Sequence, residues 1–366
     1  MNTALATSPL SLRSMWNGPV VDADVHAVVP SYADLLPYMS PHWRAYSRER
    51  GFAGTNLAVE HTYPPNAPST VRPEWRPADG RPAASSVDLL RSDLLDPLRL
   101  DLAIVNCYYG VDWMRHPDVG PMLARAVNDW LVAEWLDREP RLRASIVVPG
   151  YNPEEIAKEI RRVGEHPGFV QVMLPIRGDI PWGNRIWYPV LRALTELDLP
   201  MNLHWGGTSE MSPSPTGWAS WYVEEYAAEQ AVYIQQLLSL VSEGAFQQFR
   251  DLRVSFQEGG FTWVPSMWWR MEAKRKGARR DVPWLNEPIW ELMRERIRFT
   301  VAPTDAGPPE ELAKIVEWLG SDDLLMYASD YPHRHEDDLS ILLDSLPSDE
   351  ARAKLMSGNA RAFYRL

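Results

Sequence analysis

The sequence predicts an α/β fold, a (β/α)8 TIM barrel with a long insertion after the first strand. Short apolar runs rich in β-branched residues recur along the chain, with segments of helical periodicity between them, which is the pattern of repeated βα units. Eight such runs are present, the number that closes this barrel. A chain of 366 residues with 45% hydrophobic content can bury one large core, and we expect residues 1–366 to form a single domain.

The predicted strands are the eight apolar runs, and the predicted helices are the intervening segments in which apolar residues recur at helical spacing. The strands are residues 20–26, 102–108, 144–149, 169–174, 201–204, 253–257, 297–301 and 324–328. The helices are residues 121–136, 153–163, 187–197, 223–242, 310–318 and 348–363.

The insertion lies at about residues 45–88. About seventy residues separate the first two predicted strands, whereas most connections in compact domains are far shorter. Residues 63–84 are rich in Pro, Arg and Ala and show little periodicity. Two hypotheses stay open, a segment that covers one barrel mouth and a surface excursion without a role in binding.

Composition limits the partners and the compartment. The formal charge of −12 and the pI near 5.2 argue against a nucleic-acid partner, because phosphate binding needs a concentrated basic surface. The single cysteine, Cys107, allows no intramolecular disulfide. No window approaches the ~20 apolar residues of a membrane span, and the first fifteen residues lack a secretory pattern. We expect a cytoplasmic protein without membrane contact.

Apolar segments outside the predicted strands indicate self-association. The Trp- and Met-rich residues 265–271 and the proline-rich insertion are expected to expose more apolar surface than a monomer usually tolerates. We therefore expect a homo-oligomer, most simply a C2 dimer. A small molecule is the other expected partner.

Candidate metal ligands stand where predicted strands end, because the active site of an α/β barrel lies at the carboxyl ends of its strands. In the first strand, alternation places Asp22, Asp24 and His26 on one face. The fifth strand ends at His204, and Asp330 follows the eighth. Inward-facing acids and imidazoles at one mouth require a charge partner, and a cation meets that requirement.

The expected cofactor is one divalent metal ion bound by Asp24, His26, His204 and Asp330. Mixed carboxylate and imidazole ligands suit zinc, manganese or iron(II), and the absence of thiolate ligands argues against a structural zinc cluster. A catalytic ion lowers the pKa of bound water and polarises a substrate. Asp330 is then both a ligand and a catalytic proton shuttle, and His204 a catalytic ligand.

The chain resembles the amidohydrolase-related family that includes aminocarboxymuconate-semialdehyde decarboxylase and resorcylate decarboxylase. The resemblance runs from about residue 20 to the end and rests on an ordered set of motifs: VDADVH, LPMNLHWGG, QEGGFTWVPSMWWRME, SDYPH and SGNARAFY. It implies that Asp24 and His26 match the family's first metal motif. It further implies that His204 matches the strand-five histidine and Asp330 the strand-eight aspartate.

Two departures from the family pattern affect the expected chemistry. The first motif is Asp24-x-His26 rather than His-x-His, similar to the form found among relatives of the resorcylate decarboxylases. No lysine occurs at residues 170–173 of the fourth strand, so we expect a mononuclear site. Strand six carries Gln257 and Glu258 where the family's decarboxylases typically have an active-site histidine.

Two charged residues near the mouth have alternative roles. Glu258 is a candidate catalytic base or a partner that orients a ligand histidine, and the alternative is a structural carboxylate at a helix start or paired with an arginine. Arg177, after strand four, is a candidate clamp for a substrate carboxylate, with a surface ion pair as the alternative.

Other residues near the mouth are candidates for substrate contact. His333 and His335 follow the metal acid closely enough to reach a substrate, although a hydrogen-bonded loop position is the alternative. Trp182, Trp205 and Trp263 fit the walls of a pocket for a flat or cyclic ligand, although tryptophan is often packing.

Three functions remain open from the sequence. The favoured hypothesis is a hydrolase in which metal-activated water attacks an amide, ester, lactone or related bond of a small cyclic or aromatic substrate. The alternative is a non-oxidative decarboxylase of an aromatic or unsaturated carboxylic acid. Hydrolysis is favoured because strand six lacks the histidine that would donate a proton in decarboxylation. The third hypothesis is a non-catalytic binding barrel.

Overall fold

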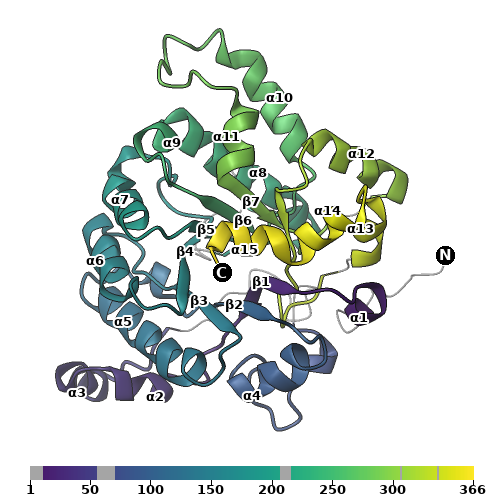
Figure 1. Cartoon of the computed structure of the whole chain (residues 1–366). Coiled ribbons are helices and arrows are strands. Elements are labelled where there is room, and N and C mark those ends of the chain that lie inside the picture. Colours follow the sequence, from purple (N-terminus) through teal and green to yellow (C-terminus); the bar gives the residue numbers. More distant parts are fainter. Residues whose placement is uncertain (1–10, 56–70, 207–215, 306, 336–337) are drawn as a thin grey trace.

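The computed structural model describes residues 11–55, 71–206, 216–305, 307–335 and 338–366. Eight parallel strands form one sheet in the order of the sequence, and Figure 1 shows them at the centre of a ring of helices. The predicted (β/α)8 barrel is confirmed. The strands are β1 (Val21–His26), β2 (Leu102–Asn106), β3 (Leu142–Ile146), β4 (Phe169–Pro175), β5 (Met201–His204), β6 (Val254–Gln257), β7 (Ile297–Thr300) and β8 (Leu325–Met326).

The barrel closes through main-chain hydrogen bonds between β1 and the segment after β8. The Ala23 amide donates to the Tyr327 carbonyl at 2.9 Å, and the His26 amide donates to the Tyr331 carbonyl at 2.7 Å. The Asp330 amide donates to the Asp24 carbonyl at 3.1 Å. Strand β8 is only two residues long, so these bonds beyond its end hold the two edges together.

Helices surround the strands, and the predicted helices are recovered among them. The last predicted helix is three consecutive segments, α14, a π-helical turn and α15, and the sequence did not predict α1 to α4, α9 to α11 or α13. The helices are α1 (Leu12–Met15), α2 (Tyr32–Leu35), α3 (Pro41–Arg50), α4 (Val87–Leu90), α5 (Val119–Leu131), α6 (Pro153–Val163), α7 (Tyr188–Glu196), α8 (Tyr222–Ser242), α9 (Ala245–Gln248), α10 (Val264–Arg275), α11 (Ile289–Arg296), α12 (Pro309–Leu319), α13 (Leu339–Ser345), α14 (Asp349–Ala353) and α15 (Asn359–Tyr364).

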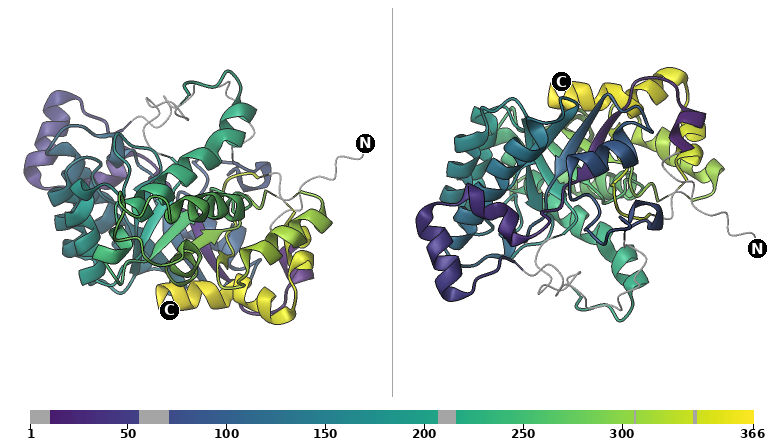
Figure 2. Two further views of the ribbon diagram at one scale, coloured as in Figure 1. Left: turned by 90° about the horizontal axis from the view of Figure 1, so that it is seen from above. Right: turned by 90° about the horizontal axis from the view of Figure 1, so that it is seen from below.

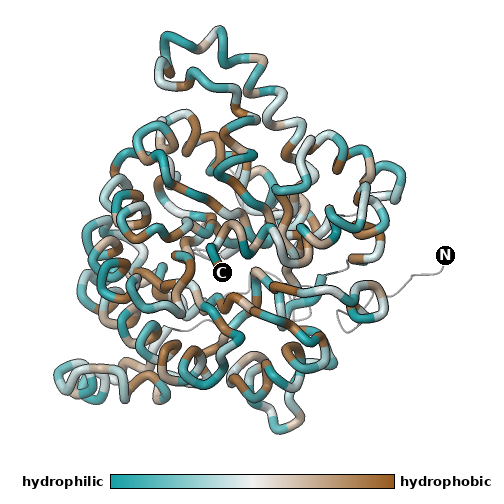
Figure 3. The backbone as a smooth tube through the Cα atoms, in the orientation of Figure 1, coloured by the Kyte–Doolittle hydropathy of each residue, from teal (hydrophilic) through white to brown (hydrophobic). Residues whose placement is uncertain are grey.

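Helix α6 shows why these segments fold as predicted. The Asn152 side chain accepts a hydrogen bond from the Glu154 amide at the helix start, and Pro153 occupies the first turn, where its missing N–H costs nothing. Ile156 and Ile160 are buried against the barrel. Figure 3 shows hydrophobic residues concentrated on the strands and alternating with hydrophilic ones along the outer helices.

The C-terminal helix α15 covers the end of the barrel opposite the metal-site candidates. Phe363 and Tyr364 are buried with Val21 and Val170, which lie near the starts of β1 and β4. Figure 2 shows α15 crossing that end in both views. The carboxyl ends of the strands, with the metal-site candidates, therefore form the opposite mouth of the barrel.

The insertion predicted at 45–88 contains secondary structure and contacts this mouth. Its described parts include the end of α3 and the start of α4, while residues 56–70 lie outside the described chain. Val71 forms an antiparallel bridge with His333, and the Arg72 amide donates to the Pro332 carbonyl at 3.0 Å. The insertion thus packs on the loop after β8.

Part of the Trp- and Met-rich segment is exposed. Trp269 on α10 and Trp318 on α12 are each 47% exposed, and their ring centroids lie 5.6 Å apart. Met267 and Trp268 are buried. The homo-oligomer remains a prediction. Within the described residues, no helix combines the length and apolar character needed to cross a bilayer.

The closing contacts of the C-terminal helix predict a loss of stability in Asn359→Ala. The buried Asn359 amide donates to the carbonyls of Asp322 (2.7 Å) and Leu325 (2.8 Å), and the substitution leaves both acceptors without this donor. We expect the free energy of unfolding to fall by about 1–3 kcal/mol in urea denaturation. The exposed Asn286→Ala should stay within about 0.5 kcal/mol of wild type. Equal stability of the two variants would contradict the assigned role.

Candidate metal centre

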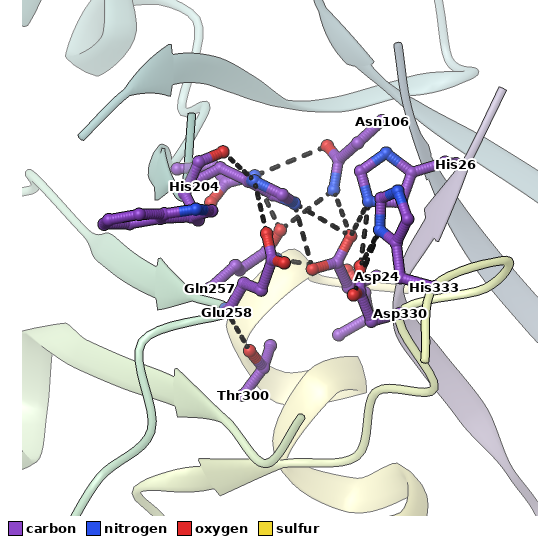
Figure 4. Close-up of polar contacts among 12 residues, drawn as sticks. Asp24, His26, Asn106, His204, Gln257, Glu258, Thr300, Asp330 and His333 are labelled. Atoms are coloured by element: carbon purple, nitrogen blue, oxygen red, sulfur yellow. Dashed lines mark hydrogen bonds and ion pairs between the residues drawn. The ribbon is translucent and has the colours of Figure 1, made fainter. Parts of the chain in front are cut away.

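The four predicted ligands lie together at the barrel mouth. Asp24 and His26 come from the end of β1, His204 from the end of β5, and Asp330 from the turn after β8. All four are buried, and one ligand atom from each lies within 4.8 Å of the others. Figure 4 shows the carboxylates of Asp24 and Asp330 between the imidazoles. The four residues that the sequence predicts as metal ligands therefore lie together in the folded chain.

Each imidazole pairs with a carboxylate from a different strand. His26 Nε2 lies 2.9 Å from Asp330 Oδ1, and His204 Nε2 lies 3.2 Å from Asp24 Oδ1. The two rings meet edge to face with centroids 5.2 Å apart. His204 Nδ1 donates to the Trp205 carbonyl at 2.7 Å, so Nε2 is the nitrogen left to bind a cation.

Burial and clustered charge shift the pKa values of these groups in opposite directions. Burial opposes protonation of His204, but the carboxylates of Asp24, Glu258 and Asp330 outweigh it and raise its pKa to about 10. Burial, with the repulsion of His333, lowers the pKa of His26. Burial would raise the pKa of Asp330, but the surrounding histidines hold it well below its usual range. The carboxylates of this centre therefore favour the binding of a cation.

The donor set fits a divalent ion. Asp24 Oδ2 is buried and accepts no hydrogen bond from any described residue, although His204 Nε2 lies 3.1 Å from it. A buried carboxylate oxygen without a donor is costly unless a cation binds it. Two carboxylates and two imidazoles suit manganese, zinc or iron(II).

Two histidines after β8 also contact Asp330. His333 Nδ1 lies 3.1 Å and His335 Nε2 2.6 Å from Asp330 Oδ2. The Tyr226 hydroxyl lies 3.3 Å from His335 Nδ1. Asp330 is thus bordered by three imidazoles, including that of His26. Both His333 and His335 are hydrogen-bonded loop residues, which is the alternative that the sequence left open. Both also lie beside the metal centre.

Glu258 lies beside Asp330, His335 and His204. Its carboxylate oxygen, one His335 nitrogen and one Asp330 oxygen lie within 4.8 Å of one another, and Oε2 is 3.5 Å from His204 Nδ1. Burial and the Asp330 charge raise the pKa of Glu258 to about 7. Because His204 Nδ1 is much closer to the Trp205 carbonyl, Glu258 is not the main group that orients His204.

Glu258 and Asp330 both have left-handed backbone conformations, with φ of +62° and +53°. This region costs a non-glycine residue about 1–3 kcal/mol and is enriched at functional sites. The Glu258 amide donates to Thr300 Oγ1 at 3.1 Å, which helps to hold the conformation. Glu258 follows the end of β6 directly, Asp330 lies in the segment after β8, and both carboxylates lie at the centre.

The predicted substrate-contact residues separate into two groups. Arg177 lies 4.5 Å above the Trp205 ring, with Nη1 3.6 Å from Glu225, and Trp205 follows the ligand His204. Trp182 instead is buried, donates its indole N–H to the Pro175 carbonyl at 2.7 Å, and packs on Trp187. These contacts are those of a residue packed in the core, so Trp182 is no longer a candidate for substrate contact.

Sequence reasoning missed several residues that the fold brings to the centre. Asn106 at the end of β2 donates from Nδ2 to Asp24 Oδ1 at 2.7 Å. Arg72 from the insertion and Tyr226 from α8 both contact His335. The signal for Asn106 was present in the sequence, because an amide stands inside the apolar run AIVNCYY. Arg72 and Tyr226 carried no such signal.

The chain resembles known proteins in sequence and in fold. The sequence model of the amidohydrolase family matches residues 21–366. A gamma-resorcylate decarboxylase of Rhodococcus jostii (strain RHA1) is 26% identical over 267 residues, which cover 67% of this chain and 77% of that protein.

Solved structures share the fold at low sequence identity. An amidohydrolase from Mycobacterium avium subsp. paratuberculosis K-10 superposes with a TM-score of 0.70 at 18% identity, covering 95% of this chain and 98% of that one. A dihydroxybenzoic acid decarboxylase from Polaromonas sp. JS666, with bound manganese and the inhibitor 2-nitroresorcinol, gives a TM-score of 0.66 at 18% identity, covering 96% and 98%.

Proposed function

The chain belongs to the amidohydrolase family, and we propose that it is a metal-dependent decarboxylase that releases carbon dioxide from an aromatic carboxylic acid. One divalent ion would be held by Asp24, His26, His204 and Asp330. The observation that carries this proposal is the position of Glu258, whose carboxylate lies next to the proposed ligand Asp330. A group able to deliver a proton therefore borders the ligand set.

This proposal replaces the hydrolase that the sequence favoured. That preference rested on strand six, which has Glu258 where the family's decarboxylases have a histidine. Glu258 itself can carry the proton, because burial and the Asp330 charge raise its pKa to about 7, and the loop after β8 adds His333 and His335 beside Asp330. The Rhodococcus relative is a decarboxylase, which supports the same activity for this chain.

In the proposed reaction, the metal ion and the side chains have separate roles. A divalent ion held here would bind and polarise the substrate's carboxylate, and manganese is our proposal because the Polaromonas decarboxylase structure contains it. The bond between the ring carbon and the carboxyl carbon breaks, and its electron pair stays on the ring carbon. That carbon takes a proton from Glu258 while carbon dioxide leaves.

The substrate wall consists of aromatic and charged groups beside the ligands. The Trp205 ring offers a flat face next to His204, and Arg177 stacks on it. Arg177 Nε is buried and has no hydrogen-bond partner among described residues, so a polar substituent of the substrate could use this donor. His333, whose side chain is about one-third exposed, completes the proposed wall. A hydroxybenzoate fits these groups.

We expect about one divalent ion per chain in protein from manganese-supplemented cells, measured by elemental analysis. A chelator should remove both metal and activity, and manganese should restore them. Asp24→Asn should lower the metal content because it weakens a ligand, whereas Asp322→Asn, which alters the distant contact with Lys354, should not. Metal-free protein that is active and insensitive to chelators would contradict the proposed centre.

The activity is tested by carbon dioxide release from a panel of hydroxybenzoates, with matched amides, esters and lactones in parallel. We expect carbon dioxide and the corresponding phenol from at least one hydroxybenzoate, because the site combines metal ligands with a proton donor. Hydrolysis of the amides, esters or lactones without any carbon dioxide release would refute the decarboxylase and restore the hydrolase hypothesis.

Glu258→Gln tests the proposed proton donor. The amide keeps the size of the side chain but cannot transfer a proton, so we expect the rate to fall about 100-fold or more at every manganese concentration, with unchanged metal content. Glu311→Gln, on the exposed face of α12, should keep the wild-type rate. Recovery of the Glu258→Gln rate in excess manganese would instead assign Glu258 to support of the ligand His204.

A further inference from the structure

The interior of the barrel contains a layer of polar side chains. Barrel interiors are dominated by bulky branched residues, yet five successive strands here place fully buried polar residues side by side. A buried polar group is tolerated only when it is hydrogen-bonded, so each of these groups depends on its neighbours. They are Asn106 on β2, Ser145 on β3, Gln171 on β4, Asn202 on β5, and Ser255 and Gln257 on β6.

Three of these residues form a directed chain of hydrogen bonds that ends on Asp24. Gln171 Nε2 donates to Ser145 Oγ at 2.8 Å. Ser145 Oγ donates to Asn106 Oδ1, and Asn106 Nδ2 donates to Asp24 Oδ1 at 2.7 Å. The chain takes one residue from each of β4, β3, β2 and β1, which are neighbours in the barrel.

The direction of this chain follows from the donors available. A serine hydroxyl has one proton, and because Ser145 accepts from Gln171, that proton goes to Asn106 Oδ1. The Asn106 amide therefore has its Nδ2 directed towards Asp24. Gln257 reinforces this orientation, since its Oε1 accepts from Asn106 Nδ2 at 3.0 Å and from Asn202 Nδ2 at 2.7 Å.

If the Asn106 amide were reversed, hydrogen-bond acceptors would face one another. Its Oδ1 would then face Asp24 Oδ1 and Gln257 Oε1, both of which are acceptors, inside a buried core where such contacts are costly. The Gln257 amide is itself fixed, because its Nε2 donates to the Ala23 carbonyl at 3.0 Å. The network thus has one consistent arrangement.

We propose that Asn106, held by Ser145 and Gln171, is a positioning residue that orients Asp24 for the metal ion. Asn106 donates to Oδ1 of Asp24, whereas Oδ2 has no hydrogen-bond donor among the described residues and lies 3.1 Å from the proposed ligand atom His204 Nε2. Figure 4 shows the Asn106 amide directed at Asp24 beside His204. This inference rests on the proposed metal centre, and it assigns part of the metal affinity to three strands that contribute no ligand.

The experiment measures the Kd of the full-length apo protein for Mn²⁺, by the electron paramagnetic resonance signal of the free ion. Asn106→Ala should raise Kd by about 10-fold to 100-fold, the usual effect of losing a group that supports a ligand. Ser145→Ala, a milder change, should raise Kd by about 10-fold, because the Asn106 amide loses the donor that fixes its direction. If Asn106→Ala does not fold, Ser145→Ala still carries the test.

Asn128→Ala is the matched control. Asn128 on α5 is equally buried, and it donates to the Val147 carbonyl and to Glu159, both at 2.8 Å, outside the barrel. This variant should lose thermal stability in the apo form while keeping the wild-type Kd. A general loosening of the fold would raise Kd in both asparagine variants, and that result would overturn the inference.

The outcomes separate this inference from the proposed function. Wild-type protein that binds no Mn²⁺ would remove the metal centre, and the inference with it. If the wild-type protein binds Mn²⁺ and the Asn106→Ala and Ser145→Ala variants have the same Kd as wild type, the positioning role alone is overturned. Weaker binding in these two variants and unchanged binding in Asn128→Ala would support it.

Discussion

The structure depends on how the two ends of the strand series are joined. Main-chain hydrogen bonds between β1 and the segment after β8 close the barrel, and one of them links the Asp330 amide to the Asp24 carbonyl. The same contact brings two carboxylates from opposite ends of the sequence into one buried centre. The contact that closes the barrel therefore also brings the two acids of the proposed ligand set together.

The concentration of buried charge then determines what surrounds the two acids. Unpaired carboxylates in a core are costly, and the neighbours of Asp330 are three imidazoles, while Asp24 is bordered by an imidazole and the Asn106 amide. The polar layer across β2 to β6 extends this compensation into the barrel interior. Hydrogen bonds there replace the apolar contacts of an ordinary barrel core, and they limit the orientations of Asp24.

The proposed decarboxylase differs from the hydrolase that strand six favoured, because Glu258 itself, whose pKa burial raises to about 7, can serve as the proton donor. Strand six has Glu258 where the family's decarboxylases typically have a histidine, and this difference predicted that the proton donor of a decarboxylase is absent. His333 and His335 are brought to Asp330 by a turn that starts in the left-handed region, and the insertion after β1 packs on that loop through Val71. The chemistry of the mouth is thus shared among loops distant in sequence.

The sequence by itself determined the eight strands and the candidate ligands Asp24, His26, His204 and Asp330, since these depend on short-range patterns: apolar runs, alternation along a strand, and polar residues where a strand ends. The tertiary structure alone decided that Trp182 packs against Trp187, that three imidazoles meet Asp330, and that the Asn106 amide donates to Asp24. Such contacts join segments far apart in the chain, so the path of the backbone and the direction of each hydrogen-bond donor decide them.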